Sequence, residues 1–350
     1  MTLLASRRPV RRVALSAAAF VAAVLIAGCT PTTPEPSPST STSTAPMARP
    51  SPTPTPTPEP VVAPLRGTEV PASIDTPALS AKIDNHWDAR PQWGLEHTDI
   101  VFEELVEGGL TRYVAVWHSD VPEEVGPIRS IRPMDPDIVS PLGGIIAYSG
   151  GQARFVAMMQ KTDVHNAIHG GADDRFMFRS TQKLAPHNVV LDAQDIVAEY
   201  DELDPPAAQF AYSPRGSAPV FGTPSGGVDL AFAPESPRSW TWDAASNTYL
   251  RAQEGRADTD STGAQLSATN VVVLRVAIDW SYGIVPRTVM IDSGQAWIST
   301  GGSVREGTWS KDSRTAAITL TDAVGREIRL APGNTWVELV PDSGSVSVHD

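Results

Sequence analysis

The sequence predicts an α+β protein with an α/β-like N-terminal domain on a mixed sheet and a mainly β C-terminal domain. Two observations support this fold class. In residues 67–205, short runs of β-branched and aromatic residues alternate with segments of helical spacing. In residues 236–345, strand-like runs recur about every ten residues with turn signals between them, which is typical of an all-β domain.

The first 29 residues have the pattern of an export signal. Four arginines at positions 7, 8, 11 and 12 precede the apolar run 13–27, which is short and alanine-rich for a membrane span. The run leads to Ala27-Gly28-Cys29, which resembles the lipobox of bacterial lipoproteins, and Cys29 is the only cysteine of the chain. We therefore expect lipidation of Cys29 (diacylglycerol and palmitate) and anchoring at the extracytoplasmic face of a bacterial cell membrane. A Sec signal that is cut elsewhere is the alternative.

Residues 30–65 consist largely of proline, serine and threonine. Such a composition cannot bury a core, so we expect a disordered, polyproline-like spacer. At about 3.1 Å per residue, this spacer would hold the folded part on the order of 100 Å from the membrane. The tract is also a candidate for O-linked glycosylation.

The mature chain is strongly acidic. Removal of the signal leaves 23 basic residues against 40 acidic ones, a net charge of −17. This charge argues against nucleic acid as a partner. An anionic ligand would therefore have to be bound by a local basic pocket.

A β-hairpin is predicted around the glycine pair 108–109, because strand formers flank it on both sides. A two-residue turn there would pair Leu105 with Arg112. Alternation along the strands would then put Glu103, Glu107 and Arg112 on one face. An ordinary cross-strand salt bridge is the alternative to a functional role for this group.

The rest of the N-terminal domain is predicted as strands and helices in alternation. A helix is expected over 152–161, after a glycine pair that could present free amides to an anion, and another is expected after Asp192, its N-cap. Residues 163–174 are predicted as a loop, because His165 and His169 could share a metal only on a helix and lack a third ligand at fixed spacing. Strands are expected at 78–83, 142–148, 176–179 and from 189 onward.

A stretch rich in proline, glycine and serine, residues 206–235, is predicted to connect the two domains. Five tryptophans beyond it could line a sugar platform, but we favour the hydrophobic core for them. They are Trp240, Trp242, Trp297, Trp309 and Trp336. Strands are predicted at 239–242, 248–251, 270–275, 288–291, 307–311, 316–320, 327–330 and 335–340.

Several short motifs resemble those of the YerB-like lipoprotein family, and the match extends over nearly everything after the spacer. The resemblance implies an envelope lipoprotein whose two halves are domains of unknown function (3048) and brings no established reaction. The motifs are Asp84-Asn85, Arg90-Pro91-Gln92, Glu107-Gly-Gly-Leu-Thr-Arg112, Gly126-Pro127-x-Arg129-Ser130-x-Arg132-Pro133, Gly150-Gly151, Pro186-His187-Asn188, Tyr249-Leu-Arg251 and Pro332-Gly-Asn-Thr-Trp336.

The leading functional hypothesis is a binding or scaffolding module with an arginine-lined pocket for an anionic envelope ligand. Arginine suits phosphate and carboxylate oxygens, and proline and glycine bound these loops, where sites commonly lie. Arginines that merely tie loops together through carboxylates are the alternative. The predicted ligand-binding residues are Asp84, Asn85, Arg90, Glu103, Glu107, Arg112, Arg129, Ser130, Arg132, Gly150, Gly151, Arg179, His187 and Asn188.

The second hypothesis is a hydrolase or transferase that acts on wall glycan or peptide, with Glu107, Asp84 and His187 as catalytic candidates. Glu103 and Glu107 would stand about 13 Å apart on one strand, too far for a glycosidase pair. The sequence contains no phosphate loop, dinucleotide fingerprint or zinc signature, so no cofactor and no metal are expected. The expected partners are the membrane, an anionic wall polymer or peptidoglycan, and an envelope protein.

Overall fold

A computed structural model describes residues 60–214 and 222–349 of the chain. The predicted signal, Cys29 and residues 30–59 of the predicted spacer lie outside the described residues. Ala63 and Leu65 are fully buried, so the folded part begins within the last residues of the predicted spacer. None of the helices in the described residues has the length and apolarity needed to cross a membrane.

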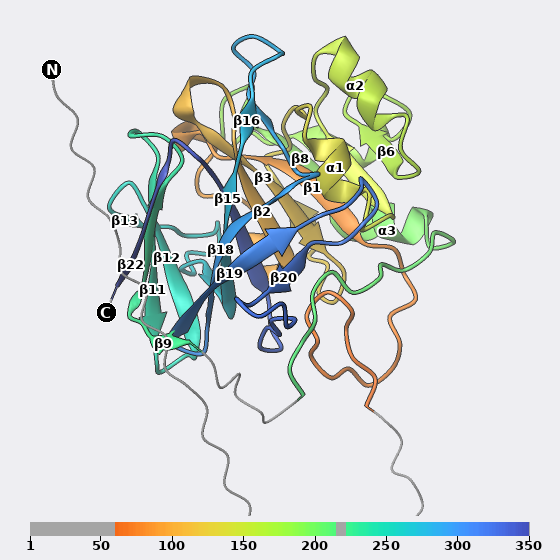
Figure 1. Ribbon diagram of the computed structural model, residues 1–350. Helices are drawn as coiled ribbons and strands as arrows, with labels where there is room; N and C mark the ends of the chain where they lie inside the picture. The colour runs from red at the N-terminus through yellow and green to blue at the C-terminus, as the bar shows by residue number, and fades with distance from the viewer. Residues whose placement is uncertain (1–59, 215–221, 350) are drawn as a thin grey trace, which may run out of the picture. The chain divides into compact units, whose positions relative to one another are not determined.

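A large mixed sheet forms the centre of the molecule (Figure 1). Its strands follow the order β20-β19-β18-β15-β21-β2-β3-β1-β5-β6, and β9 pairs with β19. Their bounds are β1 Leu79–Asp84, β2 Ile100–Leu105, β3 Thr111–Trp117, β5 Ile145–Tyr148, β6 His165–Ile168, β9 Thr223–Pro224, β15 Asn270–Val276, β18 Ser293–Thr300, β19 Ser303–Ser310, β20 Thr319–Thr321 and β21 Thr335–Pro341.

Strands from both predicted domains lie in this one sheet. β21, from the C-terminal part, pairs in parallel with β2 on one side and with β15 on the other. β1 pairs antiparallel with β3 and in parallel with β5. The mixed sheet expected from the sequence is therefore confirmed, and the C-terminal part contributes five of its eleven strands.

The smaller sheets are antiparallel. One consists of β13, β12, β11, β10 and β22, with β14 beside β12, and it supports the predicted β character of the C-terminal part. β10 falls within the predicted connecting stretch. The bounds are β4 Glu124–Val125, β7 Met177–Arg179, β8 Val189–Asp192, β10 Gly227–Ala231, β11 Pro237–Asp243, β12 Thr248–Gln253, β13 Arg256–Ala257, β14 Ser267–Ala268, β16 Ile278–Asp279, β17 Arg287–Thr288 and β22 Ser345–His349.

The helices are short. The two that the sequence predicts are present as α2 (Ala153–Met159) and α3 (Ala193–Glu199), and α1 (Asp135–Val139) was not predicted. Asp192 occupies the N-cap position of α3, but its side chain accepts no capping hydrogen bond. Single 3₁₀ turns are η1 Trp87–Ala89, η2 Leu95–His97, η3 Glu107–Gly109 and η4 Asp174–Phe176.

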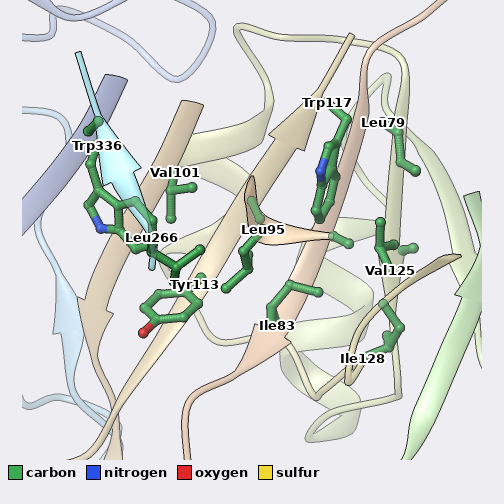
Figure 2. Packing of buried hydrophobic residues seen from close by; sticks show 14 of the residues in the cluster. Leu79, Ile83, Leu95, Val101, Tyr113, Trp117, Val125, Ile128, Leu266 and Trp336 are labelled. Atoms are coloured by element: carbon green, nitrogen blue, oxygen red, sulfur yellow. The ribbon is translucent and has the colours of Figure 1, made fainter. Parts of the chain in front are cut away.

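Hydrophobic residues cover both faces of the central sheet, because successive side chains of a strand point to opposite sides. On one face, Tyr113 and Trp117 of β3 pack with Leu79 and with Trp336 of β21 (Figure 2). On the other face, Val114 and its neighbours pack with residues of α1 and α2. Four of the five tryptophans considered above are buried, as we favoured; Trp242 is half-buried.

The predicted register of the hairpin is wrong by one residue. The turn is the three-residue η3, not a two-residue turn, and Arg112 pairs with Glu104 instead of Leu105. Because a shift of one residue exchanges the faces of a strand, Glu103 and Arg112 lie on opposite faces of the sheet. The expected group of Glu103, Glu107 and Arg112 on one face does not form.

Other sequence-based expectations also require correction. The predicted loop at 163–174 contains β6, which pairs in parallel with β5, although its polar composition resembles a loop. The predicted strands at 288–291 and 327–330 are reduced to β17 and to isolated pairings. β18 was not predicted, because its serines, threonine and glycine weaken the pattern of a strand.

The glycine pair before β5 allows a direct test of close packing. Gly143 and Gly144 have nearly the same backbone φ, +63° and +61°, in the left-handed region. A Cβ at Gly143 would meet nothing within 4 Å, whereas a Cβ at Gly144 would lie 2.3 Å from the Ala78 carbonyl oxygen, which accepts a hydrogen bond from Ile145.

We therefore expect Gly143→Ala to cost about 1 kcal/mol in left-handed strain alone. Gly144→Ala should cost about 3 kcal/mol or more, because β1 must also shift. Urea unfolding of the two variants measures this difference. Equal losses of unfolding free energy in the two variants would show that the lack of space beside Gly144 adds nothing to the cost.

Candidate functional site

The arginine-bearing loop of residues 126–133 completes one edge of β1. β5 pairs with only the first half of that strand. Beyond it, the Asp84 amide donates to the Pro127 carbonyl (2.9 Å) and the Arg129 amide donates to the Lys82 carbonyl (2.7 Å). This backbone pairing holds Arg129 beside Asp84, the last residue of β1.

Asp84 is the centre of the polar contacts at this edge. Its Oδ2 lies 2.7 Å from His187 Nδ1 and 3.0 Å from Arg129 Nε, and its Oδ1 accepts the His86 amide at 3.2 Å. Burial alone would raise the pKa of Asp84, but Arg112, the His187 hydrogen bond and Arg129 outweigh it and lower the pKa. Asp84 is therefore a buried carboxylate that stays ionised.

Three guanidinium groups, Arg112, Arg129 and Arg132, form what we call the arginine cluster. Nη1 of Arg112 and Nη1 of Arg132 both donate to the Ser130 carbonyl, at 2.6 and 3.3 Å. Arg132 also contacts Glu107 Oε2 through Nε and Nη2, each at 2.8 Å. Burial and the neighbouring Arg132 lower the pKa of Arg112 to about 10, so these cations are close enough to repel one another.

Ser130 and the glycine pair 150–151, which were predicted as ligand-binding residues, meet at this loop. The Ser130 hydroxyl donates to the Ser149 carbonyl (3.0 Å), and the Ile131 amide donates to the Gly150 carbonyl (3.1 Å). A Cβ on Gly151 would lie 3.1 Å from the Ile131 side chain. The glycines therefore allow close contact with the arginine loop.

The Arg90 side chain forms structural contacts with Asn85 and Glu254. It donates to the Asn85 side chain (3.0 Å) and the Asn85 carbonyl (2.9 Å), and it forms a two-pronged pair with Glu254, both bonds at 2.9 Å. The hydrogen bond from Arg90 is also the main reason why the pKa of Glu254 is lowered. Arg90 thus ties the end of β1 to the β12–β13 turn.

Arg179 and Asn188 lie on the β7–β8 hairpin and contact each other. Arg179 Nη1 donates to Asn188 Oδ1 (2.8 Å), and Asn188 Nδ2 donates to the Ser180 carbonyl (3.0 Å). The Arg179 side chain does not belong to the arginine cluster. Its role is to fix the hairpin that carries His187.

Glu103 is not part of the predicted site. It is fully buried on the opposite face of the sheet, where it accepts hydrogen bonds from Arg238 (2.9 Å) and Thr111 (2.6 Å) and pairs with Arg251 (2.5 Å). Its assignment as a ligand-binding residue followed from the incorrect register and is withdrawn.

A buried triad of ionisable side chains that was not predicted from the sequence lies beneath the arginine cluster. Lys82, Glu104 and Asp135 are all fully buried, and the Lys82 ammonium contacts both carboxyl groups, Asp135 at 2.9 Å. Asp135 Oδ2 also accepts the Arg132 amide (2.6 Å). A lysine inside the apolar run 78–83 was the signal in the sequence that could have pointed to it.

Two shallow clefts flank Arg90 and Pro91. One, of about 490 Å³, is lined by Asp88, Trp93, Lys183 and Leu184 among others. The Lys183 ammonium lies 4.6 Å from the centre of the Trp93 ring, and burial lowers the pKa of this lysine. The second cleft, of about 500 Å³, is lined by Trp87, Glu254 and Arg256 among others.

The site thus unites most of the predicted residues from five separate segments. Of the three catalytic candidates, Asp84 and His187 are in contact, whereas Glu107 is paired with Arg132 and forms no hydrogen bond with either of them. The structure brings together Asp84, Glu107, Arg112, Arg129, Ser130, Arg132, Gly150, Gly151 and His187. Asn85, which Arg90 contacts, lies instead with the Glu103 network, because its amide donates to Thr111 (2.8 Å) and Gln253 (3.1 Å).

The fold and these motifs define a protein of a family without a known activity, whose chain matches an N-terminal and a C-terminal domain. Residues 65–206 match the N-terminal domain, and residues 228–337 the C-terminal domain, of the protein of unknown function family DUF3048. The chain belongs to this family. The resemblance inferred from the short motifs is confirmed.

A curated relative and a solved structure agree with this assignment. The chain is 25% identical over 307 residues to the protein described as "Putative lipoprotein YerB" of Bacillus subtilis (strain 168), covering 82% of this chain and 88% of that protein. It also resembles the crystal structure of the YerB protein from Bacillus subtilis, with a TM-score of 0.73, 23% identity, and coverage of 82% of this chain and 99% of that one. The second likeness confirms the fold.

Proposed function

We propose that this protein is a lipid-anchored binding protein of the bacterial cell envelope, and that the arginine cluster binds an anionic envelope ligand. The ligand class is a polymer or fragment that carries phosphate or carboxylate groups. The similarity to a protein described as a lipoprotein supports the envelope location, together with the export signal and the Ala27-Gly28-Cys29 sequence.

The observation that carries this proposal is the incomplete pairing of Arg129. Its Nε faces Asp84, but neither of its terminal nitrogens has a hydrogen-bond partner in the part of the chain that the structure describes. The side chain is 23% exposed, so these donors are accessible from solvent. An arginine fork with free donors matches the geometry of phosphate and carboxylate oxygens.

The charge balance of the site also favours an anionic ligand. Two carboxylates contact the arginine cluster directly: Asp84 contacts Arg129, and Glu107 contacts Arg132. Arg112 lies close enough to both for their charges to affect its pKa. The cluster therefore carries about one excess positive charge, in a chain whose net charge is −13. An anion would relieve the repulsion among the three guanidinium groups, and this favours binding there over the acidic surface.

Arg129→Gln is expected to weaken retention of the protein on purified cell wall about tenfold or more, because a charge-assisted hydrogen bond contributes about 1.5–3 kcal/mol. Sedimentation of the protein with wall preparations measures this. Wall with its anionic polymer intact and wall stripped to peptidoglycan distinguish a phosphate polymer from peptidoglycan carboxylates as the ligand.

Arg175→Gln is the matched control. Arg175 is an exposed arginine paired with Glu199, so this variant makes the same charge change away from the site. Retention of the control variant at the wild-type level, with loss in Arg129→Gln, supports the proposal. Equal retention of wild type and Arg129→Gln on both wall preparations would refute it.

A further inference from the structure

A second feature of the same edge does not depend on the arginine cluster. His86 and Asp88 lie on the turn after β1, and His187 comes from the segment before β8, about a hundred residues later. One ligand atom from each of these three side chains lies within 4.8 Å of the other two. The imidazole rings of His86 and His187 are stacked, with centres 4.5 Å apart and planes 13° apart, so the partly exposed His86 ring has to turn before both rings point a nitrogen at one ion.

We propose that His86, Asp88 and His187 bind a divalent transition metal ion of the zinc type, and that Asp84 orients His187 for it. Two imidazoles and one carboxylate form the donor set of zinc sites that keep an open coordination position. No metal was expected from the sequence, because it contains no zinc signature.

The contact between Asp84 and His187 determines which nitrogen of His187 is available to a metal ion. Nδ1 of His187 lies 2.7 Å from the Asp84 carboxylate, which makes Nδ1 the protonated nitrogen and leaves the lone pair on Nε2. Among residues 60–214 and 222–349, Nε2 of His187 has no hydrogen-bond partner. A carboxylate that holds the second nitrogen of a metal-binding histidine is a usual companion of such sites.

The other two ligands can close around an ion. Tetrahedral zinc bonds of about 2.0–2.1 Å place ligand atoms roughly 3.3 Å apart. His86 Nδ1 and Asp88 Oδ2 already lie 3.5 Å apart, and the Asp88 side chain is 63% exposed, so it is free to move. Binding at Nδ1 of His86 would displace one 3.2 Å hydrogen bond from the Asp88 amide.

The surroundings leave a fourth position accessible to a ligand. Asp88 also lines the cleft of about 490 Å³ that contains Lys183. Arg129 contacts the same oxygen of Asp84, Oδ2, as His187 does, so the Asp84 carboxylate is shared between this arginine and the ligand histidine. A metal ion bound by Asp88 would therefore lie beside this cleft, from which a further ligand can reach it.

Titration of the metal-stripped full-length protein with Zn²⁺, and with Co²⁺ as a coloured substitute, tests the proposal. Calorimetry should show one equivalent bound, and Co²⁺ should give the visible absorption of a tetrahedral site. His86→Ala should abolish binding, and Asp88→Asn should weaken it at least tenfold. Asp84→Asn should weaken it about 10- to 100-fold, as expected for a residue that orients a ligand.

His169→Ala is the matched control. His169 is also 20% exposed in its side chain and is paired with an acid, Asp174 at 2.8 Å, but it lies outside the proposed site. This variant should bind the metal as the wild type does. Absence of Zn²⁺ binding by the wild type, or equal weakening in His169→Ala and His86→Ala, would overturn the proposal. Circular dichroism of each variant shows whether a loss of binding reflects unfolding.

Discussion

Replacing Glu103 with glutamine is expected to lower the free energy of unfolding by about 3 kcal/mol or more at pH 7. The same replacement at Glu338 should cost less than about 1 kcal/mol. The two glutamates face each other on neighbouring strands, β2 and β21, and both are fully buried. Their different expected effects follow from their different protonation.

Glu103 is the charged member of this pair. Burial alone would raise its pKa, but Arg238 and Arg251 outweigh this and lower the pKa to about 2. Because the folded pKa lies below the unfolded value of 4.5, its stabilising contribution is complete at neutral pH and is lost only as the pH falls below 4.5. A glutamine would leave two buried guanidinium groups without their shared carboxylate.

Glu338 is the uncharged member. Burial and the charge of Glu103 raise its pKa well above the ordinary value, so the carboxyl group is protonated at pH 7. Its Oε1 accepts a hydrogen bond from Trp240 Nε1 (2.7 Å), which a glutamine oxygen can also accept. The amide of that glutamine can donate to Glu103 in place of the carboxylic proton.

Urea unfolding at pH 7 measures both losses, and each variant serves as the control of the other. Equal losses would mean that the negative charge is shared evenly between the two carboxyl groups. Glu306→Gln, on the exposed side of β19, reports the cost of the same change without burial.

This buried network also shows what the sequence could not reveal. The alternation of residues in β2 and β3 was predicted from strand propensity, and both strands exist. Their register depends on whether the glycine turn contains two or three residues, and the composition of the turn does not decide that. The error of one residue moved Glu103 to the wrong face and hid the pairing of Glu104 with Arg112.

The sequence indicated the arginine-bearing loop, but not the topology that places it. Proline and glycine around Arg129, Ser130 and Arg132 correctly indicated a loop that presents polar groups. That this loop would take the edge of β1 beside Asp84 depends on the short pairing of β5, which leaves the end of β1 free. Contacts between distant segments, such as that of Asp84 with His187, require the whole sheet and cannot be derived from local patterns.

The second large effect is expected at Glu104, the next residue of β2. There the replacement by glutamine should raise the free energy of unfolding at alkaline pH instead of lowering it. Burial and the charge of Asp135 raise the pKa of Glu104 to about 8, and the contact with Lys82 only partly offsets this. The folded protein therefore retains a proton on Glu104 that the unfolded chain loses near its ordinary pKa of 4.5. Stability is complete below that value and is lost as the pH rises from 4.5 to about 8.

Glu104→Gln should remove this pH dependence, because glutamine resembles the protonated carboxyl group. One retained proton corresponds to about 1.4 kcal/mol per pH unit. The variant should therefore lie within about 1 kcal/mol of the wild type at pH 5, where the unpartnered amide is its main cost. At pH 8 it should be the more stable protein by about 2 kcal/mol or more.

Urea unfolding of both proteins between pH 5 and 8.5 measures the two curves, which are expected to cross. Glu103→Gln is the matched control, since it makes the same change one residue away on the other face and should remain destabilised throughout. Parallel curves for the wild type and Glu104→Gln would show that Glu104 is ionised at neutral pH. Lys82 would then hold two buried carboxylates, and the charge beneath the arginine cluster would be negative instead of neutral.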